Sequence, residues 1–574
     1  MWKHLRPNQN VPCKEKPGGA AWCGDEHGFP VWRREGAPLA HEEHRTRFPL
    51  KLTRKEALKL GALGSAALLL PVQRAARTQL TIKDRLPESR LPVPFRVPLS
   101  IPPLARPLRR DNKRKIDFYS MTMKAARVQI LPDGPKTYIF GYDGITPGPT
   151  IREKRGRRCV VRQINRLPKT HPYLGYECTT SVHLHGSDSL PQYDGWAEDV
   201  IRPGQYKDYR YPDDQDARPL WYHDHAIHHT AQNAYMGCAA LYTTHDELEA
   251  SLPVPKGYGR YEIPLVIQDK IFAQNGNFIY DDDGENSLYG DVILVNGRPW
   301  PTMKVERRKY RLRFLNASVS RGFHLALDSG EPFTVVGHDG GFAPEPTEVT
   351  SFRLGMAERY GVIVDFARHK IGDQIVLRNL GLPNNQDFAN TDVIMRFDVV
   401  SNATSTAGNS VPDRLNPSTG RHNPMRLRES DAARTRKWVF ERKNGLWTIN
   451  GRTWDSQRSD ADVPHDDVEI WELENRSGGW FHPIHLHLVD FKILDRNGGP
   501  PFAYERGPKD VAYVGEGETV RVIARFGPTR GKYMMHCHNL VHEDHDMMTH
   551  FDVGATGRDP AEIAPARPLP APPL

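Results

Sequence analysis

The chain has 574 residues, of which 38% are hydrophobic and 26% charged, and its formal net charge is +8. This length predicts several folded domains, and the composition excludes an intrinsically disordered protein. No apolar run reaches the roughly 18 residues that a transmembrane helix needs, so we expect no membrane span. Beyond the N-terminal region the basic residues alternate with acidic ones, which argues against nucleic acid as a partner.

The N-terminal part of the chain predicts an export signal followed by an arm. Residues 1–110 are basic and rich in proline. Within them, residues 51–77 place Arg54 and Lys55 before the apolar run from Leu60 to Leu70, an order typical of an export signal with half of a twin-arginine pair. We therefore expect a periplasmic, cell-surface or secreted protein; a misassigned start or an uncleaved helix is the alternative. The proline-rich residues 91–104 predict an extended arm.

Three strand-rich blocks follow the arm. Forty-eight prolines and 47 glycines favour many short strands joined by turns. Alternating apolar runs fall into blocks at 111–248, 258–400 and 436–555. Residues 401–435 predict a linker, and the alanine- and proline-rich residues 556–574 predict a disordered tail. The expected fold class is all-β, with three consecutive β-sandwich domains.

Histidines recur in pairs two residues apart. Because alternate residues of a strand point to the same face, about 7 Å apart, each pair can serve neighbouring metal ions in one pocket. Imidazole suits copper, zinc, iron and nickel, so these pairs predict a transition-metal cluster without choosing the metal. The pairs are His183 with His185, His223 with His225, His485 with His487, and His536 with His538.

Cysteine narrows the choice of metal. Cys537 lies between His536 and His538 and must point to the opposite strand face, so its thiolate serves a different metal ion. His482, Cys537, His542 and Met547 together supply the ligand set of a blue-copper electron-transfer site. The adjacent residues then form a short covalent path for electrons between two metal sites.

The remaining cysteines and histidines give weaker signals. The six cysteines contain no C-x-x-C pair; Cys159 and Cys178 are either a disulfide formed after export or two unrelated buried thiols. We interpret isolated histidines as surface or core residues. Four histidines lie near the pairs without fitting the strand spacing and are left unassigned: His228, His229, His545 and His550.

At these residues the sequence resembles the multicopper oxidases, and among them most closely the bilirubin oxidases and bacterial spore-coat laccases. The resemblance covers about residues 91–553. It is carried by Asp-Gly-Trp-Ala-Glu-Asp at 194–199, Leu-Trp-Tyr-His-Asp-His-Ala at 220–226, His-Pro-Ile-His-Leu-His-Leu-Val-Asp-Phe at 482–491, and His-Cys-His-Asn-Leu-Val-His-Glu-Asp-His-Asp-Met-Met at 536–548. It implies three cupredoxin-like Greek-key domains and an oxidase that takes single electrons from phenols, aromatic amines or tetrapyrroles and reduces dioxygen to water.

The resemblance also implies four copper ions and their ligands. His482, Cys537, His542 and Met547 would hold the type 1 copper, and His183 with His485 the type 2 copper. The two type 3 ions would be held by His185, His223, His225, His487, His536 and His538.

Three further residues are functional candidates. Reducing dioxygen to water consumes protons, and the resemblance nominates Asp194 and Glu543 to deliver them; the alternative is that each only accepts a hydrogen bond from a ligand imidazole. Trp480 would border the type 1 site where the donor docks, or else be a plain core residue. Asp224 points away from its neighbouring ligands and is expected to be structural.

Two other functions compete with this interpretation. A cuprous oxidase serving copper tolerance is ranked lower because the twelve methionines form no methionine-rich insert. A copper-free envelope scaffold of the same fold is disfavoured by the full ligand set. The expected partners are a small-molecule electron donor and dioxygen, and the expected state is a monomer.

Overall fold

The computed structural model describes residues 23–24, 30–31, 80–418, 420, 422–554 and 557–574. The expected export signal at 51–77 lies outside these residues. Two short strands, β1 (Cys23–Gly24) and β2 (Pro30–Val31), pair antiparallel within the unit formed by residues 1–76. The remaining strands and helices belong to the unit formed by residues 77–574. Among the described residues, no helix is long and apolar enough to cross a membrane.

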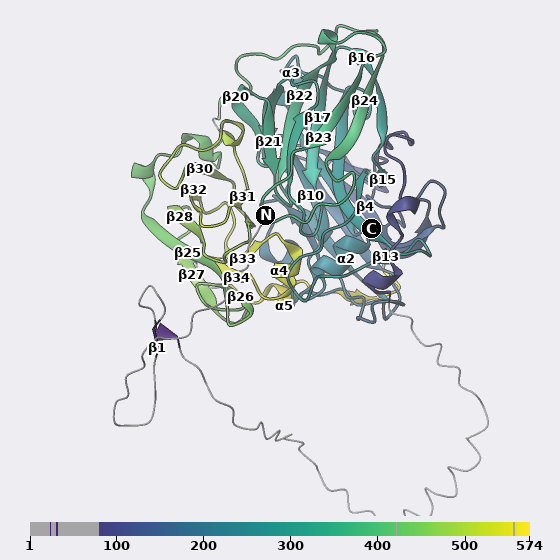
Figure 1. Ribbon diagram of the computed structural model, residues 1–574. Coiled ribbons are helices and arrows are strands. Elements are labelled where there is room, and N and C mark those ends of the chain that lie inside the picture. Colours follow the sequence, from purple (N-terminus) through teal and green to yellow (C-terminus); the bar gives the residue numbers. More distant parts are fainter. Residues whose placement is uncertain (1–22, 25–29, 32–79, 419, 421, 555–556) are drawn as a thin grey trace, which may run out of the picture. The chain divides into compact units, whose positions relative to one another are not determined.

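The first block of strands forms two sheets (Figure 1). One sheet has the order β6 (Ile151–Lys154), β11 (Ala239–His245), β10 (Arg218–Asp224), β8 (Val182–His185). The other has the order β3 (Arg109–Asp111), β4 (Ile116–Val128), β7 (Arg158–Asn165), β9 (Gln205–Tyr211), β35 (Arg567–Pro568), with β5 (Thr137–Tyr142) beside β4.

The second block also forms two sheets. The larger has the order β15 (Arg298–Pro299), β14 (Val292–Val295), β12 (Glu262–Phe272), β17 (Lys309–Asn316), β22 (Arg359–Asp365), β19 (Phe333–His338), β20 (Gly341–Val349), with β13 (Phe278–Ile279) beside β12. The smaller has the order β16 (Thr302–Arg307), β24 (Val393–Asn402), β23 (Gln374–Asn379), β18 (Phe323–Leu327), β21 (Ser351–Leu354).

The third block, green to yellow in Figure 1, repeats the pattern. One sheet has the order β26 (Leu446–Ile449), β25 (Arg434–Lys443), β28 (Val468–Asn475), β32 (Thr519–Arg525), β30 (Phe491–Arg496). The other has the order β27 (Ser459–Val463), β34 (Met548–Val553), β33 (Gly531–Cys537), β29 (His482–Leu486), β31 (Val511–Val514).

The three blocks share one topology. In each block, an early strand pairs in parallel with a later one in each of the two sheets: β4 with β7 and β6 with β11, β12 with β17 and β16 with β24, β25 with β28 and β27 with β34. Parallel neighbours need a crossover between the sheets, as a Greek-key sandwich supplies. The all-β prediction is confirmed. The first two blocks contribute to one continuous apolar core, and the third has a core of its own.

Helices in the described residues are short. The α-helices are α2 (Thr230–Met236), α3 (Glu247–Ser251), α4 (Leu540–Asp544) and α5 (Pro560–Ile563). The 3₁₀-helices are η1 (Ile82–Asp84), η2 (Glu88–Arg90), η3 (Pro191–Tyr193), η4 (Phe366–Arg368), η5 (Pro424–Arg426), η6 (Glu429–Asp431) and η7 (Ala503–Glu505). Asp544 at the end of α4 accepts hydrogen bonds from the first two backbone amides of α2, both 2.9 Å, and so links the third block to the first.

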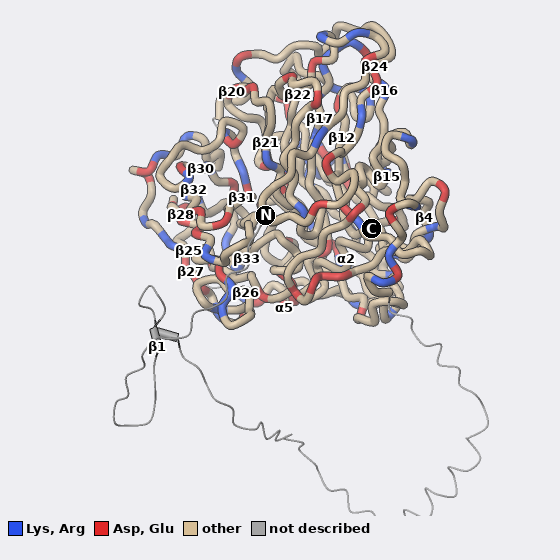
Figure 2. The backbone as a smooth tube through the Cα atoms, viewed as in Figure 1, with Lys and Arg blue, Asp and Glu red and all other residues tan. Residues whose placement is uncertain are grey.

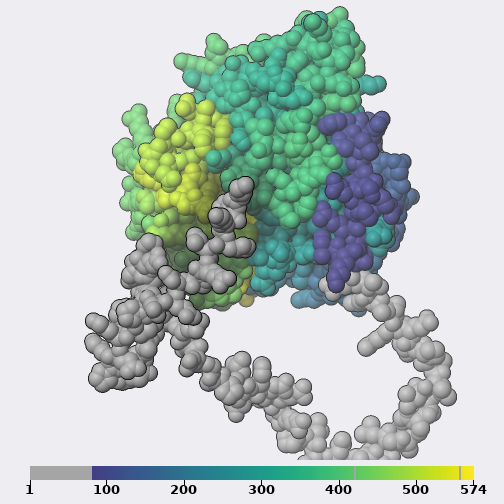
Figure 3. Space-filling view, viewed as in Figure 1, coloured from purple at the N-terminus to yellow at the C-terminus, as the bar shows by residue number. Residues whose placement is uncertain are grey.

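The proline-rich arm runs extended against the second block. The backbone amide of Phe95 donates to the Trp300 carbonyl at 2.8 Å, and the amide of Leu99 donates to the Thr302 carbonyl at 2.8 Å. In Figure 3 the purple residues that begin this unit lie on the surface of the teal and green part. Lys and Arg are mixed with Asp and Glu along the strands in Figure 2, so no stripe of one charge stands out in this view.

The expectation of a disordered tail is wrong for residues 557–574. Helix α5 begins at Pro560, and β35 pairs antiparallel with the edge strand β9 through Arg567 and Tyr206. Arg162 also donates to the Pro572 carbonyl. Proline is tolerated on edge strands because its missing N–H can face away from the ladder, so a proline-rich composition does not prevent this pairing.

Candidate metal centre

Strand register brings the histidine pairs together. In the first block, His183 on β8 lies directly opposite His223 on β10. In the third block, His485 on β29 lies directly opposite His536 on β33. All eight paired histidines are at most 1% exposed. They converge from two blocks that are about 300 residues apart in the sequence and are called here the histidine cluster.

The imidazole nitrogens of the histidine cluster form three groups whose ligand atoms lie within 4.8 Å of one another. These groups are His183, His185 and His485; His185, His223 and His538; and His225, His487 and His536. In the second group the buried Nδ1 of His185 and the Nε2 atoms of His223 and His538 have no hydrogen-bond partner. Buried polar atoms normally have partners, so converging orphaned nitrogens fit metal ions well.

The protonation of the cluster suits metal binding. Burial, and then the neighbouring imidazoles, lower the pKa values of His183, His185, His485, His487 and His538 well below the usual range. Burial lowers the pKa of His223 to about 3 and that of His225 to about 4. These imidazoles are therefore neutral near pH 7, the form that coordinates a metal.

Two buried carboxylates contact imidazole rings of the histidine cluster. The Asp194 carboxylate lies 2.7 Å from Nδ1 of His487, and the Asp194 carbonyl accepts from Nδ1 of His183. Glu543 lies 2.8 Å from Nδ1 of His536 and 3.5 Å from Nδ1 of His225. Both predicted acids thus reach the cluster. Burial raises the pKa of Asp194; burial would also raise that of Glu543, but the two neighbouring imidazoles lower it to about 2.

A third carboxylate was missed by sequence reasoning. Asp510 lies 3.1 Å from Nε2 of His185, its backbone carbonyl lies 2.9 Å from Nδ1 of His485, and Arg359 binds it through two hydrogen bonds of 2.5 and 2.6 Å. No spacing signal marks Asp510, because it reaches the cluster only through the pairing of β31 with β29. Asp224 accepts from the Ser181 and Ala226 amides and points away from the ligands.

A second donor set surrounds Cys537 and is called here the Cys537 cluster: His482, Cys537, His542 and Met547. The Cys537 Sγ lies 3.2 Å from Nδ1 of His482 and 3.7 Å from Nδ1 of His542, and these two nitrogens are 3.2 Å apart. Met547 is fully buried in the same apolar core as Cys537. Three donor atoms facing one another, with a thioether close in sequence, fit one soft transition-metal ion.

Aromatic and polar residues hold the Cys537 cluster in place. Trp447 stacks on the His542 ring, with the two ring centroids 3.7 Å apart. The ring centroid of the half-buried Trp480 lies 5.6 Å from that of His542 and 5.4 Å from that of Trp447. Nε2 of His482 lies 2.8 Å from the hydroxyl oxygen of Ser477. Sequence reasoning selected Trp480 but missed Trp447, which comes from another strand.

One covalent segment joins the two clusters. Cys537 is bonded to His536 and His538, and these two histidines belong to different groups of the histidine cluster. The relay expected from their order in the chain is therefore geometrically possible.

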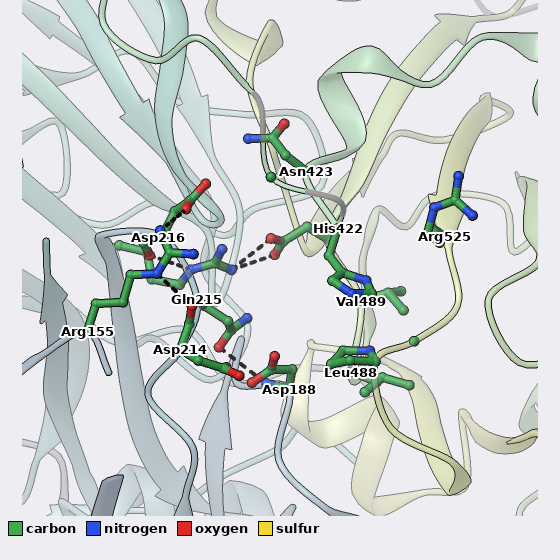
Figure 4. A pocket seen from close by; sticks show the side chains of 15 residues that line it. Arg155, Asp188, Asp214, Gln215, Asp216, His422, Asn423, Leu488, Val489 and Arg525 are labelled. Atoms are coloured by element: carbon green, nitrogen blue, oxygen red, sulfur yellow. Dashed lines mark hydrogen bonds and ion pairs between the residues drawn. The ribbon is translucent and has the colours of Figure 1, made fainter. Parts of the chain in front are cut away.

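A polar cavity of about 340 Å³ lies beside this assembly, between loops of the first and third blocks (Figure 4). In the cavity lining, a guanidinium nitrogen of Arg218 lies 2.7 Å from a carboxylate oxygen of Asp490. Asp188 lines the lower part of the cavity in Figure 4. Burial, and then Asp214, raise the pKa of Asp188 to about 7. Asp188 follows His185 of the histidine cluster by three residues, and Leu488 in the cavity lining follows His487 directly.

Three other cysteines and two of the unassigned histidines, His228 and His545, lie outside the two clusters. Cys159, Cys178 and Cys238 are buried free thiols, so the disulfide alternative is wrong. Nδ1 of His228 lies 3.0 Å from the Asp544 carbonyl, and Nδ1 of His545 lies 2.7 Å from the Val541 carbonyl.

Comparisons with known proteins agree with this geometry. Family models described as multicopper oxidase match residues 124–248, 221–393 and 423–557. Bilirubin oxidase of Albifimbria verrucaria is 44% identical over 483 residues, covering 80% of this chain and 81% of that protein. A laccase of Bacillus subtilis is 34% identical, covering 79% and 97%.

A solved structure shows the same architecture. The crystal structure of a multi-copper oxidase from Pediococcus acidilactici aligns with a TM-score of 0.71 at 30% identity, covering 81% of this chain and 92% of that one. The cupredoxin-like, three-domain fold expected from the sequence is thereby confirmed. The chain belongs to the multicopper oxidase family, whose members are copper-dependent oxidoreductases with dioxygen as electron acceptor.

Proposed function

We propose that this protein couples one-electron oxidation of phenolic, aromatic amine or tetrapyrrole donors at the Cys537 cluster to four-electron reduction of dioxygen to water at the histidine cluster. The observation that carries the proposal is Cys537, whose thiolate faces one donor set while its two sequence neighbours face the other. The names of the bilirubin oxidase and laccase relatives support this class of donor.

Four copper ions would fill the two clusters. The Cys537 cluster would hold the type 1 ion, and His183 with His485 the type 2 ion, since their Nε2 atoms are 3.4 Å apart. The two remaining triads would each hold one type 3 ion. When bound, the copper ions supply the electron transfer and the dioxygen chemistry.

The protein's own residues would then manage the donor and the protons. Trp480 is half-buried beside His542 and would form part of the surface against which a flat aromatic donor packs. Asp194 and Glu543 contact ligand imidazoles on the side of the histidine cluster and would pass protons toward it. We further propose that the protein is exported by the 51–77 segment and acts as a monomer.

Replacing the cysteine tests the proposal. We expect copper-loaded wild-type protein to contain about four copper ions per chain, to be blue, and to oxidise bilirubin and simple phenols in air. Cys537→Ser should lose the blue colour and donor oxidation together, because serine does not supply a soft thiolate ligand. A Cys537→Ser protein that stays blue and active would contradict the assignment. Comparing turnover on Cu(I) with turnover on a phenol separates this function from a cuprous oxidase.

A further inference from the structure

A second group of soft side chains lies on the strand face that carries His536. On β33, Met534 and His536 share a face, and on β34, Met548 and His550 do. The strand register places Met548 directly opposite His536 and His550 directly opposite Met534. Directly opposed residues of antiparallel strands have Cβ atoms about 4.5–5.5 Å apart, so each opposed pair lies side by side on this face.

Trp196 closes the group from the first block. It packs in one apolar cluster with Met534 and Met548, and its ring centroid lies 5.4 Å from that of His550. All four side chains are at most 2% exposed. Trp454 packs on the outside of the cluster, partly buried, with its ring 5.4 Å from Trp196 and 5.8 Å from His550.

His550 is out of place in an apolar core. Neither of its ring nitrogens has a hydrogen-bond partner, and the indole nitrogen of Trp196 lacks one too. A buried imidazole without partners destabilises a fold, whereas an apolar residue of similar size would not. The charged groups that influence His550 electrostatically are Lys532, Asp460, Arg458 and Asp455. None of them makes a hydrogen bond to its ring nitrogens.

The chemistry of these donors points to one kind of ligand. Two thioethers are soft, uncharged donors that favour Cu(I), and an imidazole is compatible with copper, whereas Ca²⁺ and Mg²⁺ require oxygen ligands. An indole face beside the donors favours a cation through its π electrons. Met534, Met548 and His550 are not among the expected ligands of the two clusters, although Met548 lies directly opposite His536 of the histidine cluster.

We propose that Met534, Met548 and His550 bind one Cu(I) ion, with Trp196 packed against it, in addition to the copper ions of the two clusters. The methionines are separated by 14 residues in the sequence, so the absence of a methionine-rich insert does not exclude such a site. Strand pairing assembles it.

Silver(I) is a suitable probe because it is soft and monovalent like Cu(I) but is not oxidised by dioxygen. The copper-loaded full chain is titrated with Ag(I) in chloride-free buffer, and bound silver and tryptophan fluorescence are measured. We expect wild-type protein to bind one silver ion per chain more than Met534→Leu/His550→Phe, with fluorescence quenching that the variant lacks. Met356→Leu, a buried methionine of the second block, is the matched control and should bind as wild type does.

A second measurement uses Cu(I) itself. Under anaerobic conditions, competition with a Cu(I) chelator should show that Met534→Leu binds the additional Cu(I) ion at least tenfold more weakly than wild type does. The single variant is used because the double variant could misfold. Equal silver uptake by wild type and variants, or no Cu(I) bound beyond the two clusters, overturns the proposal. Blue absorbance and phenol oxidation are recorded on the same samples, so failure of the oxidase function is distinguished from failure of this site.

Discussion

Asp510 shows how a single residue can organise the histidine cluster. Its carboxylate contacts His185, its carbonyl contacts His485, and its charge is balanced by the buried Arg359. Residues that orient metal-bound imidazoles typically change metal affinity by about 10–100-fold when replaced. The geometry therefore makes Asp510 a positioning residue for two ligands that come from different blocks.

For Asp510→Asn we expect the histidine cluster to lose copper at chelator concentrations that leave the wild-type protein loaded, while the Cys537 cluster keeps its blue absorbance. Arg359 would also lose one of its two buried carboxylate partners and keep Asp339 at 3.7 Å, so the free energy of unfolding should fall by about 2 kcal/mol. Copper content after dialysis and urea unfolding measure the two effects. The exposed pair Asp392–Arg378 supplies the control: Asp392→Asn should change neither quantity.

Replacing Glu543 distinguishes a role in proton delivery from a role in orienting imidazole rings. If it passes protons, Glu543→Gln should reduce turnover with dioxygen by about 10²–10⁴-fold while copper content and blue absorbance remain. Glu247→Gln, at a surface carboxylate whose side chain is 82% exposed, should behave as wild type. Copper loss in proportion to lost turnover would show instead that Glu543 holds His536 and His225 in place.

The clustering of the histidine pairs could be predicted from the sequence because their spacing is local: alternate residues of a strand share a face whatever the rest of the fold does. Asp510, Arg359 and Trp447 could not, because each reaches its partner through a register between strands distant in sequence. Met534 and His550 became neighbours only once the pairing of β33 with β34 was known.

At the scale of elements, strand β12 carries an unusual buried lysine. The Lys270 ammonium donates to the Tyr235 carbonyl of α2 at 2.8 Å and lies 4.0 Å from the centre of the Tyr235 ring. Burial lowers its pKa to about 7, although the neighbouring Asp269 opposes this. The contact between α2 and β12 therefore includes a cation that is costly to keep charged.

This lysine predicts a pH dependence of stability. Below pH 7 both the folded and the unfolded states hold the proton, and between pH 7 and 10.5 only the unfolded state does. The contribution of Lys270 to the free energy of unfolding should thus rise with pH in this range, by at most about 1.4 kcal/mol per pH unit. The free energy of unfolding of wild type minus that of Lys270→Met, from urea unfolding at pH 7.5, 8.5 and 9.5, should become more positive as the pH rises. A constant difference would contradict the burial argument.

Element boundaries were less predictable than strand content. Alternation of buried and partly exposed residues marks β4 clearly, as its burial pattern shows. The tail after Gly554 lacks such alternation, yet β35 pairs with β9 because an unpaired strand edge accepts almost any extended segment.

At the scale of the whole unit, the histidine cluster joins two domains. Strands β8 and β10 of the first block and β29 and β33 of the third each contribute histidines to the cluster, whereas the described residues of the second block contribute none. The Arg218–Asp490 pair and the Asp544 contacts to α2 link the same two blocks. The Cys537 cluster, in contrast, takes all its ligands from the third block.

Removing copper from the histidine cluster should therefore destabilise the protein more than removing it from the Cys537 cluster. An ion that binds only the folded state stabilises it by about 4 kcal/mol when its concentration is 1,000 times its Kd. Ions in the histidine cluster additionally hold two domains together, since their ligands come from both. We expect calorimetry to show a larger fall in Tm after complete chelation than after loss of the type 1 ion alone in Cys537→Ser. Chelation should also separate one unfolding transition into two, because the first and third blocks then keep only their protein contacts. Equal Tm values for the two copper-depleted forms would mean that the protein contacts, and not the shared ions, fix the domains against each other.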